Sequence, residues 1–499
     1  MGAQHEIFGY IYMDDNNKFS YFRTCFVAKP NIKEAVVKIY TVSNSYNYHE
    51  PWQMWGQKIF NGSGCIISGN RILTNAHIVR DNTFIQVRRS GEAKRYTAET
   101  EMVSHESDLA ILKVKDESFF DGIEPAEIGD LPEIKDEVIV YGFPEGGDKL
   151  SITEGVVSRI EHTKYSHSST YLLICQIDAA INSGNSGGPV FNKDNKIIGV
   201  AFQGFLNGRY DNIGYMIPAP VIKHFFEDIK DGKNDGTPDI GLSMQKMENP
   251  DMRRKYLMTE KQTGVLIIKV YPDSPAEGIL KPNDILLSIE GKNIENDGTI
   301  EFRQGERTYF GYLMQQKQIN DLAEFKILRN GKIKEASVKL TKPIDYERLV
   351  PFERYEQSPA YYIRGGLVFE TLTLNYLMEY GNEKDWHINA PKELINFYIN
   401  GEPTREQREI VVLVKVLADE INVGYHDFVD AVIYSVNGVK ISGIADLVDG
   451  FEKNKGEYDI IEDIHGSSMV LDREKANENG DNILKKYNID SSKSKYLPH

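Results

Sequence analysis

The sequence predicts a mainly β chain that is divided into about three domains. Its 499 residues are too many for one hydrophobic core, and the 40% of them that are hydrophobic suffice for globular folding. Short apolar runs such as Ile197–Phe202 and Asp284–Ile289 are typical of strands. The polar Gly/Pro segment Lys230–Pro238 is the clearest linker between domains.

The first domain contains a serine in a glycine-rich turn. The run NSGNSGGPV at Asn182–Val190 places Ser186 between two apolar, strand-like runs, 171–181 and 196–202. Such a turn brings backbone N–H groups beside a hydroxyl, which is the geometry of a nucleophile with an oxyanion hole. The pattern G-x-S-x-G also fits the nucleophile elbow of α/β-hydrolases. An elbow needs a helix directly after the serine, but here Pro189 and a new β-type run follow.

A histidine and an aspartate upstream complete the candidate site. His77 ends the motif TNAH, and Asp108 lies in the motif SDLA. The chain order His, Asp, Ser is that of the chymotrypsin-like double β-barrel. The residues leave three alternatives open: His105 as the base, Asp81 as the group that orients it, and a plain turn serine without a catalytic role.

With these segments in view, the chain resembles the Deg/HtrA family of serine proteases. The resemblance covers a trypsin-like protease domain at residues 35–229. It makes the predicted fold class more specific: the chain is expected to be mainly β, with a chymotrypsin-like double β-barrel followed by two PDZ-like α+β domains. Other segments of this domain that carry the resemblance are Asn61–Ile67, Tyr141–Pro144, Ile152–Ser158 and Ile213–Pro218. The rest of the chain resembles the branch typified by plant nuclear and plastid members, through Met247–Asp251, Asp284–Leu287, Asn296–Thr299 and Gly366–Phe369.

The resemblance implies an ATP-independent serine endopeptidase that cleaves unfolded or damaged proteins. His77, Asp108 and Ser186 are then the triad, and the oxyanion hole is expected at Gly184, Asn185 and Ser186. Apolar walls predict a pocket for small or medium aliphatic side chains. The residues expected to line it are Ile181, Asn182, Ser183, Val200, Ala201 and Phe202. Two rivals remain: a latent protease that serves as a peptide-binding scaffold or chaperone, and an esterase with His224 as its base.

Asn185 bears on how the activity is switched. Digestive trypsin-like enzymes carry an aspartate directly before the serine, and that carboxylate pairs with a new N-terminus after proteolytic activation. Asn185 has no carboxylate, so we expect switching by loop ordering instead. The candidate activation loops are Thr163–Thr170 and Phe202–Asp211.

Two PDZ-like domains are expected after the linker. The first, residues 239–341, contains Ile240, Gly241 and Leu242, which match the loop whose N–H groups capture a peptide C-terminal carboxylate. The second is divergent and is expected at residues 360–470. Ala431–Ile441 aligns without gaps to Asp284–Ile294, which supports an internal repeat.

The second copy departs from the first in two ways. Its candidate capture loop, Gly365–Phe369, is more apolar, and a helical insertion around Pro391–Ile399 interrupts it. Residues 471–499 are expected as a solvated C-terminal tail, and residues 1–34 as an N-terminal extension.

Composition limits the partners and the compartment. The net charge of −16 disfavours binding to nucleic acid or anionic membranes, and no apolar stretch is long enough for a transmembrane helix. No Cys/His cluster has metal-ligand spacing, so neither a metal nor a cofactor is expected. Three scattered cysteines and no recognisable signal segment predict the cytoplasm or another reducing compartment, such as the nucleus or an organelle.

Self-association is expected to involve aromatic residues before the first barrel. The resemblance implies a homotrimer or a hexamer, with trimer contacts supplied by this region. Alternatively, the rings simply cover the barrel. The residues concerned are Tyr46, Tyr48, Trp52 and Trp55.

Overall fold

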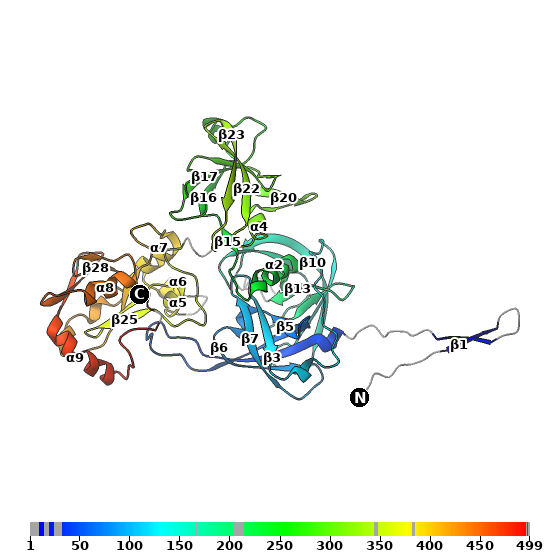
Figure 1. Ribbon diagram of the computed structural model, residues 1–499, viewed down its shortest axis with the longest axis horizontal. Coiled ribbons are helices and arrows are strands. Elements are labelled where there is room, and N and C mark those ends of the chain that lie inside the picture. The colour runs from blue at the N-terminus through cyan, green and yellow to red at the C-terminus, as the bar shows by residue number, and fades with distance from the viewer. Residues whose placement is uncertain are drawn as a thin grey trace.

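The computed structural model describes residues 9–13, 19–23, 32–165, 167–202, 214–343, 348–381, 385–495 and 497. Figure 1 shows three lobes: a double-barrel domain in blue to cyan, a first PDZ-like domain in green above it, and a second PDZ-like domain in yellow to red beside it. The predicted fold class is confirmed, because two closed β-barrels are followed by two PDZ domains. Of the expected N-terminal extension, only the hairpin of β1 (Gly9–Met13) and β2 (Phe19–Arg23) and residues 32–34 are described.

The first barrel closes in the order β3-β4-β5-β8-β7-β6. Its strands are buried on the inner face, as in β8, where every residue except Lys113 is buried. The short helix α1 (Ala76–Val79) follows β5 directly, so the barrel fixes the position of any side chain on it. The strands are β3 (Val36–Ser43), β4 (Lys58–Ile67), β5 (Arg71–Thr74), β6 (Asn82–Arg89), β7 (Tyr96–Ser104) and β8 (Leu109–Val114).

The second barrel closes in the order β10-β11-β14-β13-β12-β9. All six residues of β13 are buried, which explains why this run is apolar throughout instead of alternating. Helix α2 (Ala219–Asp228) leaves the barrel and leads to the linker. The strands are β9 (Glu137–Gly142), β10 (Ser151–Lys164), β11 (Tyr171–Ile177), β12 (Pro189–Phe191), β13 (Ile197–Phe202) and β14 (Gly214–Pro218).

The first PDZ-like domain is built on an antiparallel sheet in the order β16-β17-β18-β22-β23, with β19 paired to β18. Strand β16 therefore lies at a sheet edge. A separate hairpin, β20–β21, reaches toward the second barrel. The elements are β15 (Pro238–Asp239), β16 (Leu242–Lys246), α3 (Pro250–Lys255), β17 (Val265–Val270), β18 (Ile285–Ile289), β19 (Lys292–Asn293), β20 (Thr299–Arg303), β21 (Glu306–Tyr309), α4 (Gly311–Met314), β22 (Leu322–Arg329), β23 (Lys332–Lys339) and β24 (Lys342–Pro343).

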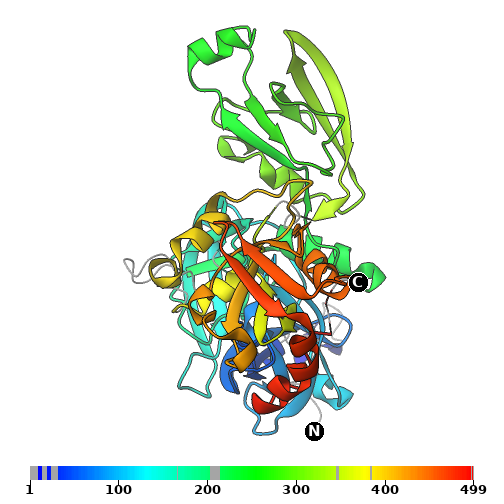
Figure 2. The same cartoon turned by 90° about the vertical axis from the view of Figure 1, so that its left-hand side faces the viewer.

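The second PDZ-like domain has two small sheets, ordered β25-β26-β27 and β29-β28-β30-β31. The predicted helical insertion is present as α6 and α7. Figure 2 shows this domain in front of the barrels, with the first PDZ-like domain above both. The elements are β25 (Tyr361–Arg364), β26 (Leu367–Thr371), α5 (Leu374–Met378), α6 (Trp386–Asn389), α7 (Lys392–Asn400), β27 (Val411–Val416), β28 (Ile433–Val436), β29 (Val439–Lys440), α8 (Ile444–Glu452), β30 (Tyr458–Asp463), β31 (Ser468–Asp472) and α9 (Arg473–Lys486).

The internal repeat appears as the same hairpin in both PDZ-like domains. β18 turns into β19 through Glu290 and Gly291, and β28 turns into β29 through Asn437 and Gly438. All four turn residues have positive φ, between 50° and 79°, which is the backbone of a two-residue hairpin turn. The repeat seen in the sequence is therefore a repeat of structure.

The expected C-terminal tail is instead part of the second PDZ-like domain. Ile483 on α9 is 1% exposed and Ile489 is 6% exposed, and both belong to its hydrophobic core. Beyond them, Lys493 pairs with Tyr362 in an antiparallel bridge. The basic side chains of this segment suggested solvation, but α9 buries its apolar side while exposing the lysines.

The aromatic segment before β4 packs within the chain. Tyr48 is 5% exposed and lies in the core of the second PDZ-like domain, and the Trp52 ring contacts Tyr361 at 6.3 Å. The backbone N–H of Tyr48 and the indole N–H of Trp55 both donate to one oxygen of Glu379, at 3.0 and 2.9 Å. Both predictions, a trimer contact and a cover for the barrel, are therefore wrong for Tyr48, because the second PDZ-like domain already buries it. Trp52 is only partly buried against the same core, and Trp55 is 54% exposed.

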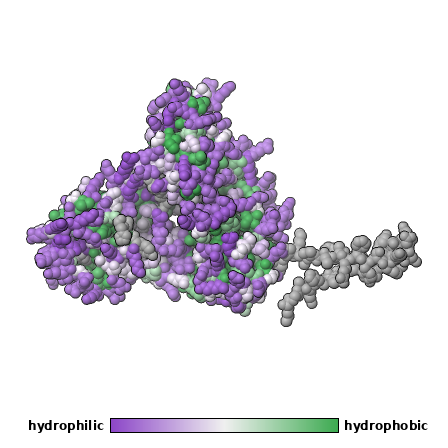
Figure 3. All heavy atoms as spheres, viewed as in Figure 1, coloured by the Kyte–Doolittle hydropathy of each residue, from purple (hydrophilic) through white to green (hydrophobic). Residues whose placement is uncertain are grey.

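The exposed surface is mostly hydrophilic. Figure 3 shows polar side chains over most of the visible face, with scattered apolar patches, as the net charge of −16 suggests. No helix in the described ranges combines the length and the hydropathy that crossing a bilayer requires. Cys65 and Cys175 are buried free thiols, and Cys25 lies outside the described residues.

Candidate active site

The three predicted triad residues come from both barrels. His77 lies on α1 of the first barrel, and Asp108 lies in the turn that joins β7 to β8. Ser186 lies in the turn between β11 and β12 of the second barrel. The backbone joins the two halves, since the N–H of Ser63 on β4 donates to the carbonyl of Ser186 at 2.9 Å.

His77 and Asp108 form a two-point contact. The carboxylate of Asp108 accepts from the backbone N–H of His77 at 2.8 Å through Oδ1, and contacts Nδ1 of the ring at 2.7 Å through Oδ2. Because an ionised carboxylate only accepts, Nδ1 carries the proton and Nε2 is left with a lone pair. Among the described residues, neither Nε2 of His77 nor Oγ of Ser186 forms a hydrogen bond, to each other or to another group.

Asp108 is held in an unusual backbone conformation. Its φ is +52°, a left-handed conformation that costs a non-glycine residue some strain. The Asn75 side chain donates to its carbonyl at 2.9 Å and secures this turn. The side chain itself is fully buried.

Tyr165 is a further partner of Asp108 that the triad motifs do not reveal. Its hydroxyl donates to Oδ2 of Asp108 at 2.5 Å, and its ring packs edge-on against Phe202. Burial alone raises the pKa of the Asp108 carboxyl, but His77, His167 and the Tyr165 hydroxyl outweigh burial and lower it. Asp108 is therefore ionised at neutral pH. Tyr165 lies in Thr163–Thr170, one of the two candidate activation loops.

The serine turn presents an N–H group for an oxyanion. The carbonyl of Ser183 accepts from the N–H of Glu145 at 2.7 Å. In a trans peptide the N–H points opposite to the C=O, so the N–H of Gly184 points away from Glu145 and is free to meet an oxyanion. Gly184 has φ +93°, and a Cβ there would lie 2.4 Å from the carbonyl oxygen of Phe143, so only glycine fits.

The three predicted oxyanion-hole residues differ in their availability. The N–H of Asn185 donates within the turn, to the carbonyl of Asn182 at 3.0 Å, while no described partner takes the N–H of Gly184 or Ser186. The chemistry therefore fits Gly184 and Ser186 as donors, with Asn185 shaping the turn. Asn185 is buried, which agrees with a structural part.

Ser63 ties this turn to both barrels. Its hydroxyl accepts from the N–H of Phe143 at 2.8 Å and donates to the carbonyl of Gly184 at 2.7 Å. Its own carbonyl accepts from the hydroxyl of Thr74 at 2.7 Å. The G-S-G triplet at residues 62–64 was the only sequence signal for this residue.

The residues predicted to line the specificity pocket split into two groups. Ile181, Val200, Ala201 and Phe202 are buried, whereas Asn182 and Ser183 are exposed. The buried group is apolar, which is consistent with an apolar pocket. The second candidate activation loop, Phe202–Asp211, lies outside the described residues except for Phe202.

The alternative assignments do not match the geometry. Strand β12 follows the serine turn, so the helix of an α/β-hydrolase is not there, and His224 contacts the carbonyl of Lys317 at 2.8 Å. Asp81 accepts from the backbone of Glu356 at 2.7 Å. Both ring nitrogens of His105 already have partners, His167 and Glu356. The described residues contain no cluster of side chains suited to a metal ion.

Comparisons with known proteins show the kind of domains that the chain contains. Residues 62–200 match the trypsin-like peptidase domain, and residues 238–340 and 350–496 each match a PDZ domain. The chain is 40% identical to "Putative protease Do-like 3, mitochondrial" of Arabidopsis thaliana, over 93% of this chain and 80% of that protein. It is 39% identical to "Protease Do-like 2, chloroplastic" of the same plant, over 92% and 74%.

More distant relatives include a parasite protein and bacterial structures. The chain is 31% identical to "Serine protease DegP homolog" of Plasmodium falciparum, over 85% of this chain and 59% of that protein. Among solved structures it is similar to "HtrA-type protease AlgW with decapeptide", with 24% identity and a TM-score of 0.47, over 62% of this chain and 95% of that one.

Proposed function

Because the chain belongs to the Deg/HtrA (Do-like) family and is a serine endopeptidase, we propose that Ser186 is its nucleophile, His77 its general base and Asp108 the group that orients His77. The observation that carries this assignment is the two-point contact between Asp108 and His77. It fixes the ring orientation and leaves Nε2 as the proton acceptor, which is what activation of a serine requires.

The reaction follows from these positions. His77 takes the hydroxyl proton as Ser186 attacks the peptide carbonyl, and the N–H groups of Gly184 and Ser186 stabilise the oxyanion. His77 then returns the proton to the leaving amine, and an acyl-enzyme remains on Ser186. Water, activated by the same imidazole, releases the acid.

The substrates we propose are unfolded or damaged proteins, cleaved without ATP after small or medium aliphatic residues. The apolar, buried surfaces of Ile181, Val200 and Ala201 support this preference. The loop Ile240, Gly241 and Leu242 of the first PDZ domain is proposed to bind peptide C-termini. With these properties, the proposed role of the protein is protein quality control.

We also propose a homotrimer or hexamer in a reducing compartment. The buried free thiols of Cys65 and Cys175 support such a compartment. The names of plant relatives as mitochondrial or chloroplastic support an organelle. Of the aromatic candidates for the oligomer contact, Tyr48 is buried within the chain and Trp55 is 54% exposed. Native mass spectrometry measures the number of subunits.

Cleavage of casein by the wild-type chain and by Ser186→Ala tests the assignment. We expect the wild type to degrade casein without ATP, and Ser186→Ala to lose at least about a thousandfold of kcat because the nucleophile is gone. A fluorophosphonate probe should label the wild type only. Equal and negligible cleavage by both proteins, with and without added C-terminal peptides, would support the peptide-binding scaffold instead.

A further inference from the structure

The segment that enters the second PDZ domain, residues 348–359 and called the linker below, contacts the double-barrel domain behind the triad; it overlaps the start of the second PDZ match at residue 350. The ring of Tyr355 stacks on two imidazoles, His105 at 4.1 Å and 29° and His167 at 4.8 Å and 21°. Tyr355 is only 6% exposed. A residue of an interdomain linker is thus buried in the protease domain.

His167 lies between Tyr355 and Asp108. Its Nδ1 is 3.2 Å from the Tyr355 hydroxyl, and its Nε2 is 3.1 Å from Nδ1 of His105. The same Nε2 is 3.9 Å from Oδ1 of Asp108. A single side chain therefore separates the linker from the carboxylate that orients His77.

His167 also shares its loop with Tyr165. Tyr165 donates to Asp108 at 2.5 Å, and the backbone of the loop closes on itself, since the N–H of Ser169 donates to the carbonyl of Tyr165 at 2.9 Å. His167 and the hydroxyl that holds Asp108 therefore belong to the same hydrogen-bonded loop. The Tyr355 ring stacks on His167 of this loop.

Glu356 fastens the linker to two segments of the protease domain. Its Oε1 accepts from the backbone N–H of Asp81 at 2.9 Å, and its own N–H donates to Oδ1 of Asp81 at 2.7 Å. Its Oε2 is 2.9 Å from Nε2 of His105. Asp81 follows the helix that carries His77, and His105 precedes Asp108. Glu356 therefore contacts both the segment next to His77 and the segment next to Asp108.

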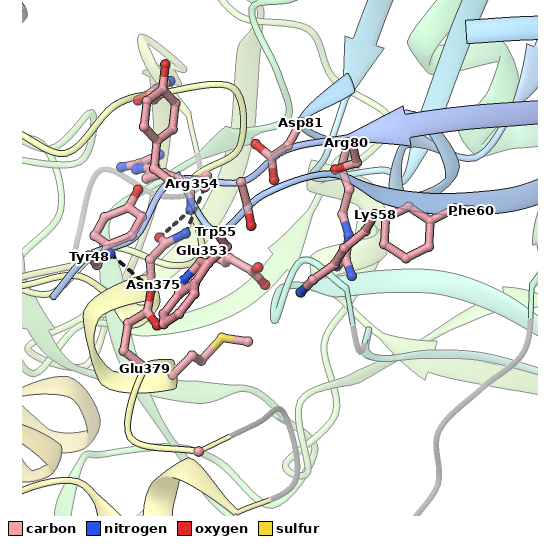
Figure 4. Close-up of a pocket in the computed structure, with 16 residues that line it drawn as sticks. Tyr48, Trp55, Lys58, Phe60, Arg80, Asp81, Glu353, Arg354, Asn375 and Glu379 are labelled. Atoms are coloured by element: carbon pink, nitrogen blue, oxygen red, sulfur yellow. Dashed lines mark hydrogen bonds between the residues drawn. The ribbon is translucent and has the colours of Figure 1, made fainter. Parts of the chain in front are cut away.

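The linker continues along a polar pocket toward the second PDZ domain. Figure 4 shows Glu353 and Arg354 of the linker facing Arg80 and Asp81 of the protease domain across this pocket of about 460 Å³. The hydroxyl of Tyr355 donates to Oε2 of Glu353 at 2.7 Å. The stacked ring is therefore oriented by the linker itself.

We propose that Tyr355 and Glu356 form a clamp that positions Asp108 through His167, so that full activity of the protease domain requires the second PDZ domain to be docked. The clamp rests on the triad assigned above. Tyr355, Glu356 and His167 are positioning residues, because they act on the reacting atoms only through Asp108. Undocking the second PDZ domain withdraws Tyr355, frees the Tyr165–His167 loop and lets Asp108 turn away from His77.

The test compares Tyr355→Ala, Tyr355→Phe and Lys415→Met in the full chain, on a short chromogenic peptide that needs no PDZ binding. Tyr355→Ala should lower kcat by about tenfold with KM changed less than twofold, because the triad is misaligned while the pocket is intact. Tyr355→Phe keeps the stacked ring and should rescue kcat to within about threefold of the wild type. The labelling rate with a fluorophosphonate should follow kcat.

Lys415→Met is the matched control. Lys415 forms an ion pair with Glu50, which also joins the second PDZ domain to the protease domain but lies away from the clamp. We expect it to leave kcat unchanged. An equal fall in kcat for Lys415→Met and Tyr355→Ala would overturn the clamp, as would an unchanged kcat for Tyr355→Ala.

Two further measurements keep the outcome decisive. If Tyr355→Ala does not fold, Glu356→Gln weakens the contact with His105 at constant shape and should lower kcat by about threefold, whereas an unchanged kcat refutes the clamp. The activity of the wild type distinguishes a failure of the proposed function from a failure of the clamp. An inactive wild type contradicts the proposed function, while an active wild type with fully active clamp variants contradicts the clamp alone.

Discussion

The two PDZ domains use the same strand in different ways. In the first domain, β16 pairs with β17 and its other side is the edge of the sheet. In the second domain, the equivalent strand β26 lies between β25 and β27, so both of its sides are paired. An added peptide strand needs a free edge, and within the described residues only the first domain offers one at this strand.

The loop before each strand explains the difference. In the first domain the N–H of Tyr271 donates to the carbonyl of Gly241, a pattern in which the N–H of Leu242 points toward the open edge. In the second domain, Gly365 and Gly366 form a tight turn with φ of 56° and 83° that returns β25 onto β26.

The carbonyls of that second turn are already bound. Gly365 accepts from the Asn422 side chain at 2.9 Å, and Gly366 accepts from the N–H of Leu417 at 2.7 Å. The candidate capture loop of the second domain is therefore a closed hairpin. We therefore expect the first domain to bind peptides and the second to hold the chain together.

The largest expected effect comes from removing residues 491–499, of which Ser491, Ser492 and Ser494 are hydrogen-bonded to β25. Four hydrogen bonds join these serines to Tyr361 and Ile363. The N–H of Ile363 donates to the carbonyl of Ser492 at 2.7 Å, and the N–H of Ser494 donates to the carbonyl of Tyr361 at 3.1 Å. The N–H of Tyr361 donates to Oγ of Ser494 at 3.2 Å, and its hydroxyl donates to the carbonyl of Ser491 at 3.1 Å. At about 1 kcal/mol each, their loss should destabilise the second domain by about 4 kcal/mol.

Tryptophan fluorescence during urea unfolding measures this loss. All three tryptophans of the chain, Trp52, Trp55 and Trp386, lie in or against the second domain. The first domain contains none and should keep its stability, as followed by hydrogen exchange at β18. An unchanged urea midpoint would show that β25 needs no cover.

The second effect concerns how the first domain docks on the protease domain. The ring of His162 on β10 stacks between Tyr171 and Tyr309, at 5.9 Å from each, and Tyr309 belongs to the first PDZ domain. Burial lowers the pKa of His162 to about 4 from a usual value of 6.5, although Gln315 opposes the shift. Between these values the unfolded chain binds more protons, so stability falls as the pH falls.

Acidification from pH 7 to pH 5 should therefore cost about 2 kcal/mol of unfolding free energy through His162. His162→Phe keeps the stacked ring and should remove this part of the pH dependence. Denaturant titrations of both proteins at the two pH values provide the measurement. A wild-type slope that persists in His162→Phe would assign the effect to other groups.

The third effect concerns peptide capture by the open edge. Gly241 has φ +80°, so Gly241→Ala strains the loop that aims the N–H of Leu242. We expect binding of a peptide with an apolar C-terminus to weaken by about tenfold, or about 1.4 kcal/mol. Calorimetry in a Ser186→Ala background avoids cleavage of the peptide.

Gly291→Ala is the control for Gly241→Ala, because Gly291 has φ +75° in the β18–β19 turn of the same domain and no atom near a new Cβ. It should leave the affinity unchanged. The stoichiometry should be one peptide per chain. Two peptides per chain would mean that the second domain also captures peptides.

The smallest effect is expected where the two PDZ domains touch. Arg405 of the second domain forms an ion pair with Glu277 of the first at 2.9 Å, and the arginine side chain is 68% exposed. Such pairs are screened by solvent, so Arg405→Met should change stability by less than about 0.5 kcal/mol. Thermal unfolding at low and high salt provides the check, and a shift above 1 kcal/mol would indicate a stronger link between the domains.

Local motifs account for the parts that were predictable. The serine turn, the TNAH motif and the order His, Asp, Ser led to the double barrel and the candidate triad because nucleophile, base and orienting group occur in short, specific contexts. The repeat at Ala431–Ile441 likewise pointed to a second PDZ domain. In contrast, Tyr165 carries no motif, and its contact with Asp108 depends on how β10 and β11 bring their connecting loop across the barrel.

The sequence by itself determined the family, the fold class and the candidate triad of this protein, since glycine turns, apolar strands and reactive side chains are local properties. Only the tertiary structure decided which surfaces remain free. Trp52 was a candidate for an assembly surface or a barrel cover, and it is partly buried against the core of the second PDZ domain. In the expected tail, Ile483 and Ile489 belong to that core, and the candidate capture loop Gly365–Phe369 is a closed hairpin. Burial depends on contacts between residues hundreds of positions apart, such as Tyr48 with Glu379 and Tyr355 with His167, and no local pattern specifies such contacts.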